Sequence, residues 1–572
     1  MGNDHNAQRA VSTGMSALAL GAVVLSACVG GDARAGDTRS GSARRPVPVE
    51  PIVIDAPRDG DPGGAPTPAR ATHYCDCAQG AASGCMPGSD SAGDGSADKP
   101  FRTTEKARQT LLSGACGDAV YLCRGGAFDV WKEGVWTVAG EFCAPGNYRK
   151  LGAYDAKWGA GGKRPLVSGR TTFFNHVKTR KPGGGVEVEG LELRCVGCAG
   201  KKKYRGFRFY GAQRNWLIED VVIDGFGFAI QLGSDGKQPN ASDIVVAGST
   251  ILNSTGMGIL GAADRMIVHH TVFRNNACAG YGPNEASQCA YDHAWYIDGG
   301  ENLETGHSRF RDVVLRDSVF QDNCNLGSSG RCACAVVVNR GQSNLRIEGN
   351  TFVSNLDYGP ECIAIDGTGT SSNRRESCID CTIRDNTFLG GWSRVINLGG
   401  SPGLVVEGNR MQVLQGPTDP VHCAGINVKP KKDGKAGGGE ERVSSGVTIR
   451  GNAIYFDADM GGDEECIGIA IADEAAGHIV TDNAIYMEGA GELDCFHIGG
   501  EPAKVMQAMD RNVCGRGGPG TSFDWNKTGE GLEQWRSVAP KLDVGSRQAN
   551  PGFVHPRASY PAKEFRSSVG RK

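Results

Sequence analysis

The chain has 572 residues, with 61 basic and 64 acidic side chains, so its net charge of −3 gives no field that would attract nucleic acid. Glycine contributes 86 residues without a collagen period, which indicates many tight turns. The sequence has no phosphate-binding loop, nucleophile elbow, zinc-protease motif or dinucleotide fingerprint. These absences argue against an enzyme that depends on an organic cofactor.

An apolar run from Ala10 to Cys28 opens the chain, and it is short for a membrane span. Its end, LSAC, resembles the bacterial lipobox. The resemblance implies a signal peptide over residues 1–27, cleavage before Cys28 and lipidation of that thiol. The alternative is an ordinary signal peptide followed by an unrelated cysteine. The expected location is the bacterial cell envelope, as an outer-membrane or cell-surface lipoprotein. Lipidation leaves 20 of the 21 cysteines, an even number suited to an oxidising compartment.

Residues 28–72 are dominated by proline, glycine and charged residues and have no hydrophobic period. This composition predicts a disordered tether whose ends lie roughly 35–40 Å apart. We expect a single folded domain over residues 73–560 and a tail over residues 561–572.

A short phrase recurs along the folded part of the chain. An apolar residue is followed three positions later by a polar residue, most often Asn, and two positions after that by another apolar residue, as in Ile449, Asn452 and Ile454. Ten copies begin at Val188, Ile218, Val246, Val268, Leu315, Ile347, Ile383, Val406, Ile449 and Val480. The shortest spacing, near 22–23 residues with variable insertions, is typical of a coil of stacked strands.

A second, β-rich phrase follows each copy, as in CIAIDG at Cys362, so each rung of the coil holds at least two strands. We interpret the recurrent Asn as a corner residue. There its side chain can bond its own backbone and also the Asn of the next rung. A β-propeller is disfavoured because each blade needs about 40 residues.

These repeats resemble those of the right-handed parallel β-helix family, the pectate-lyase-like superfamily, over residues 90–560. The resemblance implies an all-β solenoid of roughly ten or more rungs. It also implies that residues 101–114 form a short N-terminal capping helix and that residues 117–126 form the first strand. The segment 546–556 resembles the phrase that often closes such chains. The fold serves lyases, hydrolases, esterases, epimerases and adhesins, so it leaves the function open.

The alternation of side chains along the second phrase predicts two outward columns of polar residues. Asp298, Asn339, Asp366 and Lys429 share one column. The neighbouring column holds Tyr296, Asn397, Asn427 and His497. His293 has the wrong parity for either column and is expected on the turn before the strand.

In the superfamily that the repeats resemble, anionic polysaccharides are cleaved on such a face by proton abstraction and elimination. The resemblance implies His293 as the base, Tyr296 as the acid, and Asp298 and Asp366 as ligands of a divalent cation such as calcium. The substrate would be held by Arg340, Asn397, Asn427, Lys429 and His497. The alternative is a non-catalytic surface protein that binds a glycan or matrix through the same face. We expect a monomer that contacts the membrane only through its lipid anchor.

The cysteine positions predict several disulfides. Cys423 and Cys466 hold matching positions on adjacent rungs, so their Cα atoms should lie about 5 Å apart, within bonding range. Cys278 and Cys289 could staple one loop. The two C-x-x-C pairs, Cys195 with Cys198 and Cys378 with Cys381, could mimic zinc knuckles, but disulfides are favoured in an exported chain.

The lipobox makes a direct prediction. Cys28→Ala removes the thiol that would be acylated, so the variant should be released from the membrane fraction, while the parent stays with it. The measurement is fractionation of cells that express each form. A variant that stays with the membranes as the parent does would contradict the lipoprotein interpretation.

Overall fold

The computed structural model describes the chain in segments between residues 68 and 553. The described residues are 68–130, 136, 142–158, 162–175, 183–210, 212–233, 241–277, 292–298, 310–323, 335–339, 342–354, 362–366, 378–390, 394–413, 423–432, 441–457, 465–471, 475–488, 492–517, 521–525 and 531–553. The predicted signal peptide, most of the predicted tether and the C-terminal tail therefore lie outside the described residues.

The described strands form three long parallel sheets of 14, 14 and 12 strands. The first sheet contains β1 (Arg70–Tyr74), β2 (Asp118–Cys123), β4 (Arg149–Tyr154), β7 (Gly183–Glu189), β10 (Gln213–Glu219), β13 (Ser242–Ala247), β16 (Ile267–His269), β20 (Val314–Arg316), β24 (Arg346–Glu348), β28 (Thr382–Arg384), β31 (Val405–Glu407), β36 (Thr448–Arg450), β39 (His478–Thr481) and β42 (Met506–Asp510).

The second sheet contains β3 (Ala127–Asp129), β5 (Leu166–Gly169), β8 (Glu192–Cys195), β11 (Val222–Asp224), β14 (Thr250–Leu252), β17 (Val272–Arg274), β21 (Val319–Gln321), β25 (Thr351–Ser354), β29 (Thr387–Gly390), β32 (Arg410–Val413), β37 (Ala453–Phe456), β40 (Ala484–Met487), β43 (Val513–Arg516) and β45 (Arg547–Gln548).

The third sheet contains β6 (Phe174–Asn175), β9 (Arg205–Tyr210), β12 (Phe228–Gly233), β15 (Ile259–Leu260), β18 (Trp295–Asp298), β22 (Val336–Asn339), β26 (Ile363–Asp366), β30 (Arg394–Gly399), β33 (Cys423–Lys429), β38 (Glu465–Ile471), β41 (Glu492–Ile498) and β44 (Thr521–Trp525). Two small sheets join β19 (Phe310–Arg311), β23 (Gln342–Ser343) and β27 (Cys378–Ile379), and β34 (Lys431–Lys432) with β35 (Glu441–Arg442). The helices among the described residues are α1 (Thr104–Ser113), α2 (Pro502–Val505) and α3 (Leu532–Val538).

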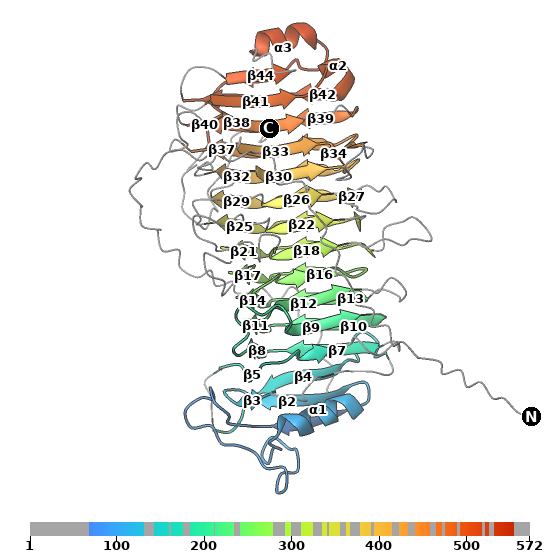
Figure 1. Cartoon of the computed structure of the whole chain (residues 1–572), viewed down its shortest axis with the longest axis vertical. Coiled ribbons are helices and arrows are strands. Elements are labelled where there is room, and N and C mark those ends of the chain that lie inside the picture. The colour runs from blue at the N-terminus through green and yellow to red at the C-terminus, as the bar shows by residue number, and fades with distance from the viewer. Residues whose placement is uncertain are drawn as a thin grey trace, which may run out of the picture.

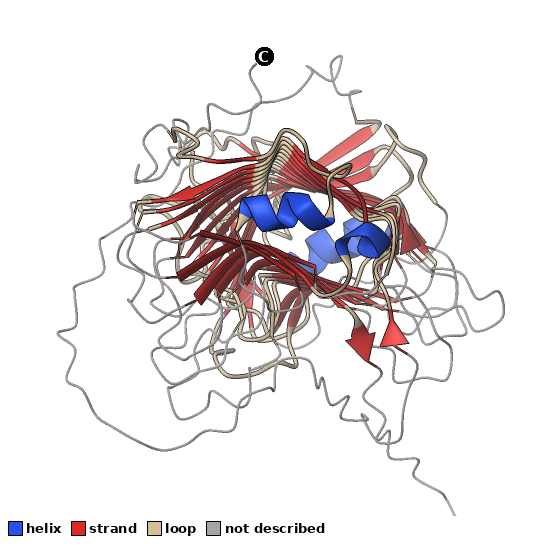
Figure 2. Ribbon diagram, turned by 90° about the horizontal axis from the view of Figure 1, so that it is seen from above, coloured by secondary structure: helices blue, strands red, loops and turns tan. Residues whose placement is uncertain are grey.

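The chain is a right-handed parallel β-helix, as the repeats predicted. Strands of each sheet stack one above another along the long axis, and the view along that axis superposes them into sheets around a narrow core (Figures 1 and 2). Side chains that point inward form one continuous buried cluster along the coil. Part of it is a column of stacked rings, in which Phe273, Phe320, Phe352 and Phe388 lie 4.4, 4.8 and 4.9 Å apart between successive centroids.

The recurrent phrase spans two strands, with its polar residue at the corner between the first and second sheets. The predicted frame is confirmed, because the apolar residues that begin the ten copies pair with one another rung by rung in the first sheet. Met509, Asn512 and Cys514 form an eleventh copy that the sequence analysis missed.

The buried Asn side chains at this corner form the predicted ladder. In Asn409, for example, the Oδ1 atom accepts from both the backbone N and the Nδ2 of Asn386, while its own Nδ2 donates to the carbonyl of Ile383. The pattern repeats through Asn350, Asn386, Asn409, Asn452, Asn483 and Asn512. These bonds satisfy backbone groups that the corner turns away from the sheets.

The residue before each Asn adopts a left-handed backbone conformation. Its φ is +65° at Gly408 and +64° at Gly451, while Asp385 and Asp482 reach +55° and +59°. Glycine and Asp tolerate this region better than branched residues do. The sequence pairs Gly-Asn and Asp-Asn therefore mark the corner itself.

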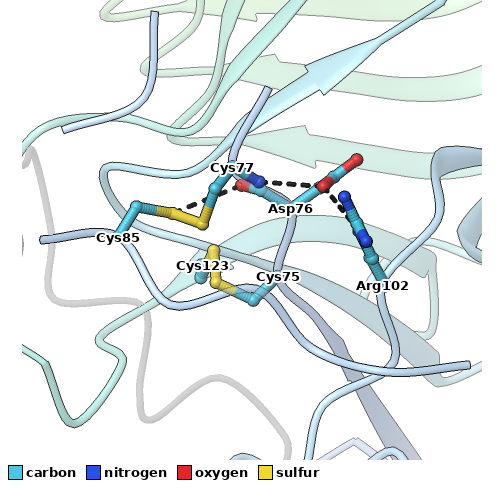
Figure 3. The surroundings of a disulfide bond; sticks show 6 residues. All are labelled: Cys75, Asp76, Cys77, Cys85, Arg102 and Cys123. Carbon is cyan, nitrogen blue, oxygen red and sulfur yellow. Dashed lines mark hydrogen bonds and ion pairs between the residues drawn. A yellow bond between two sulfur atoms is a disulfide. The ribbon is translucent and has the colours of Figure 1, made fainter. Parts of the chain in front are cut away.

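The N-terminal end of the coil is covered by the predicted capping helix, α1, which buries Ala107 and Leu111 against the first rung (Figure 1). Two disulfides, Cys75–Cys123 and Cys77–Cys85, hold this end together (Figure 3). Between them, Asp76 pairs with Arg102, whose Nε lies 3.1 Å from Oδ1 (Figure 3). This covering protects a sheet edge that would otherwise be open to other strands.

One prediction about this end was wrong. Residues 117–126 contain β2 rather than the first strand, because β1 pairs in parallel with β2 and lies outside it. The strand begins at Arg70, within the segment predicted as tether. Its Tyr74 hydroxyl lies 2.6 Å from Thr110 Oγ1, which ties β1 to α1. The polar composition next to this strand hid it in the sequence.

The predicted bond between Cys423 and Cys466 is present, with Cα atoms 4.6 Å apart. Both C-x-x-C pairs are disulfides, as favoured over zinc sites. The pair Cys278 and Cys289 lies outside the described residues. Among the described residues no helix is long and apolar enough to span a membrane.

The ladder makes a stability prediction. Asn409→Ala leaves the backbone N and Nδ2 of Asn386 and the carbonyl of Ile383 buried without their partner. Each such loss costs about 1–3 kcal/mol, so the loss of three partners should lower the free energy of unfolding by at least about 3 kcal/mol. Urea unfolding measures this, with the exposed Asn147→Ala as a control that changes it by less than about 0.5 kcal/mol. Equal effects of both changes would show that the ladder does not stabilise the fold.

Candidate functional site

The outer face of the third sheet carries the residues that the sequence analysis singled out. The strand register confirms that Tyr296, Asn397, Asn427 and His497 share one column. From Tyr296 toward the C-terminal end, the column in the described strands reads Tyr296, Val337, Ala364, Asn397, Asn427, Ala470, His497 and Asp524. The strands that carry it lie one above another along the coil (Figure 1).

The second predicted column is also confirmed in register. Asp298 pairs with Asn339, which pairs with Asp366, and Lys429 follows two rungs later. Two rung spacings place the backbones of Asp298 and Asp366 about 10 Å apart. The side chains of these two residues and Arg340 lie outside the described part of the structure, so the cation site stays a prediction.

The turn before β18 brings His293 and Tyr296 together. Their rings are stacked, with centroids 5.4 Å apart and planes inclined by 14°. His293 is only 5% exposed, whereas Tyr296 is half-buried on the outer face. His293 lies on the turn before β18, as predicted from its position in the alternation of side chains. A ligand on this face therefore meets the Tyr296 ring before the imidazole.

Two further residues join this group that the sequence analysis missed. The carboxyl of Asp292, 6% exposed, forms an ion pair with Lys202, whose Nζ lies 2.5 Å from Oδ2. Burial raises the pKa of Asp292 to about 6, although Lys202 acts to lower it. We call Lys202, Asp292, His293 and Tyr296 the central cluster. Adjacency of Asp292 to His293 was the signal available in the sequence.

The basic segment around Lys202 borders the central cluster. Lys203 Nζ lies 5.0 Å from the centroid of the Tyr204 ring, and Arg205 Nε donates to Gln231 Oε1 at 2.6 Å. Gln231 belongs to the same outward column as Tyr296, two rungs earlier. Positive charge therefore gathers on the N-terminal side of the central cluster.

The predicted substrate residues Asn397 and Asn427 bond each other. Asn427 Nδ2 donates to Asn397 Oδ1 at 2.8 Å. Asn397 is buried, at 3% exposure, and Asn427 is half-buried. Of the two, only Asn427 has a substantial surface that a ligand could contact.

His497 lies in a second group, which we call the distal cluster: Asp494, His497 and Asp524. One ligand atom from each residue lies within 4.8 Å of the others, an arrangement that could hold a metal ion. His497 Nδ1 is 2.7 Å from Asp524 Oδ2. Strict alternation would turn Asp494, three positions before His497, inward. A register shift between β41 and β44 places both on the outer side, which the sequence pattern could not show.

No family model matches the chain, and no curated protein matches its sequence. Solved structures of similar fold include an alginate lyase from Paenibacillus sp. strain FPU-7, 14% identical, covering 54% of this chain and 93% of that chain with a TM-score of 0.38. The A-module of a mannuronan C-5 epimerase from Azotobacter vinelandii is 14% identical, covering 78% and 94%, with a TM-score of 0.45. A surface adhesin of Streptococcus pneumoniae is 13% identical, covering 74% and 88%, with a TM-score of 0.43. These likenesses concern the fold alone.

The pKa of Asp292 predicts a pH effect on stability. Its folded-state pKa of about 6 lies above the ordinary value of 3.8, so folding favours the protonated form. The stabilisation is complete below pH 4 and is lost as the pH rises through 6. The free energy of unfolding of the parent, minus that of Asp292→Asn, should fall by about 2–3 kcal/mol between pH 4 and 7. Urea unfolding at both pH values measures it. A rising difference would mean that Lys202 outweighs burial.

Proposed function

We propose that the protein binds an extended acidic polysaccharide along the outer face of the third sheet and cleaves it at the central cluster. One observation carries the proposal: an imidazole, a phenol and a buried carboxyl with a pKa of about 6 gather beside a lysine at one turn. Titratable groups whose surroundings shift them toward neutral pH are typical of acid–base sites.

The reaction that these groups suit is elimination in a uronic-acid unit. A base removes the proton from C5, next to the carboxylate. The electron pair forms the C4=C5 double bond, the bond from C4 to the glycosidic oxygen breaks, and an acid protonates that oxygen. We assign His293 as the base and Tyr296 as the acid, and Lys202 with Arg205 supply positive charge for the uronate.

The burial of His293 sets the direction of approach. The sugar must lie against Tyr296, the more exposed of the two stacked rings, and a small movement of that ring would open a path to the imidazole. The carboxyl of Asp292, the residue before His293, gains its negative charge near pH 6. Activity should therefore depend on pH in that range.

The two outward columns would hold the remainder of the sugar chain. We propose that Asn427 and Lys429 contact the substrate, and that buried Asn397 positions Asn427 through their hydrogen bond. Arg340 and His497 are further proposed contacts along the same face. A calcium ion held by Asp298 and Asp366 would neutralise uronate carboxylates, in keeping with the preference of calcium for oxygen ligands.

The second candidate function is non-catalytic binding of a glycan or matrix at the bacterial surface. The low exposure of His293, 5%, favours it, because a general base needs contact with its substrate. In either case we propose that Cys28 carries a lipid anchor and that the domain acts as a monomer in the cell envelope.

The activity prediction concerns two conservative substitutions. His293→Gln and Tyr296→Phe should each lower turnover of a uronic-acid polymer by about 10²–10⁴-fold, because each removes one proton-transfer group. Formation of the unsaturated product is followed by its ultraviolet absorbance. Tyr486→Phe, on the second sheet, is the matched control and should retain parent activity.

The outcomes separate the two functions. A parent that binds uronic-acid polymers yet forms no unsaturated product would support the glycan-binding function and reject the lyase. Unsaturated product from both substituted proteins at the parent rate would reject the central cluster as the site.

A further inference from the structure

We propose that the distal cluster, Asp494, His497 and Asp524, is a binding site for a divalent transition-metal ion, with Zn²⁺ as its best match. The site lies near the C-terminal end of the third sheet, several rungs beyond the central cluster (Figure 1). The proposal does not depend on the polysaccharide function, because it rests on the donor atoms of these three residues.

The backbone holds the three side chains in place. His497 and Asp524 are direct partners on the paired strands β41 and β44. A register shift lies between Asp494 and Phe496 on β41, and Asp494 is half-buried on the same side as His497. Bulges of this kind commonly redirect a side chain next to a functional site. All three residues of the cluster therefore lie on two directly paired strands, β41 and β44.

The electrostatics of the cluster favour a cation. Two carboxylates lie within 4.8 Å of a shared imidazole, and the side chain of Asp524 is only 5% exposed. Carboxylate and imidazole groups that converge in this way offer a cation three donor atoms. The contact of 2.7 Å between His497 Nδ1 and Asp524 Oδ2 shows how tightly the strands present these donors.

The donor set identifies the class of metal. Calcium takes six to eight oxygen ligands and magnesium keeps several waters, so neither gains from an imidazole. One imidazole and two carboxylates suit zinc, whose ligands lie at about 2.0–2.2 Å in tetrahedral sites. Donors around such an ion lie roughly 3–3.5 Å apart, so side-chain rotation must open the 2.7 Å contact between His497 and Asp524 slightly and close the longer separations, which stay within 4.8 Å.

Three protein ligands leave a fourth position for water or an oxygen of a bound molecule. The neighbour in the column on the preceding rung is Ala470, which adds only a methyl group beside His497. The next rung back holds Asn427. A ligand oxygen at the fourth position would therefore lie on the same column as the half-buried Asn427.

The test is zinc binding by the full chain, after removal of metal with a chelator, measured by calorimetric titration. We expect one Zn²⁺ per chain. His497→Gln and Asp524→Asn should each weaken binding by at least about 100-fold, more than loss of an outer-shell partner typically does. Asp494→Asn, at a half-buried position, should do the same, and it remains informative if a change at buried Asp524 prevents folding.

The matched control is an imidazole pair elsewhere on the coil, formed by His269 and His270. His269 Nδ1 lies 2.9 Å from His270 Nδ1, so this pair is the main competitor for zinc among the described histidines. His270→Asn keeps a residue that tolerates the positive φ of 48° there and should leave zinc affinity unchanged. Less than half a zinc per parent chain, full affinity in His497→Gln, or loss of binding in His270→Asn would each overturn the proposal. Unchanged zinc affinity in the presence of excess Ca²⁺ supports the transition-metal class.

Discussion

The Asn ladder at the corner between the first and second sheets is the interaction on which the remaining structure depends. Each corner turns backbone groups away from both sheets, and the buried amide of Asn409, for example, bonds groups on the rung before it and on the rung after it. Because a single side chain bonds two rungs, the ladder locks their register. Insertions of very different length can then leave one rung and return to the next without shifting the strands.

Because the register is fixed, equivalent residues of successive repeats lie next to one another on the same face of the coil. On the third sheet, inward positions hold a continuous apolar core, while outward positions on successive rungs align into columns. Both clusters of titratable side chains lie where the regular inward–outward alternation of side chains is interrupted. The central cluster takes His293 and Asp292 from a turn, and the distal cluster takes Asp494 from a register shift.

Much of this could be predicted from sequence because the repeat reports the register. The frame of ten copies, the outward columns and the Cys423–Cys466 bond all follow from counting residues along equivalent rungs. Contacts between residues that hold non-equivalent positions on different rungs cannot be predicted by this counting. Lys202 reaches Asp292 from a turn several rungs earlier, and Asp524 belongs to a strand beyond the recognised copies. β1 was missed because the sequence just before it is rich in proline, glycine and charged residues.

The central claim is that an acidic sugar chain lies along the outer face of the third sheet, over Tyr296. The most direct measurement is a crystal structure of the Tyr296→Phe variant soaked with a uronic-acid oligosaccharide. We predict sugar rings against Phe at that position, with a carboxylate within hydrogen-bond distance of Lys202 or Arg205. An oligosaccharide bound on the first or second sheet, with the third sheet bare at saturating concentration, would contradict the account.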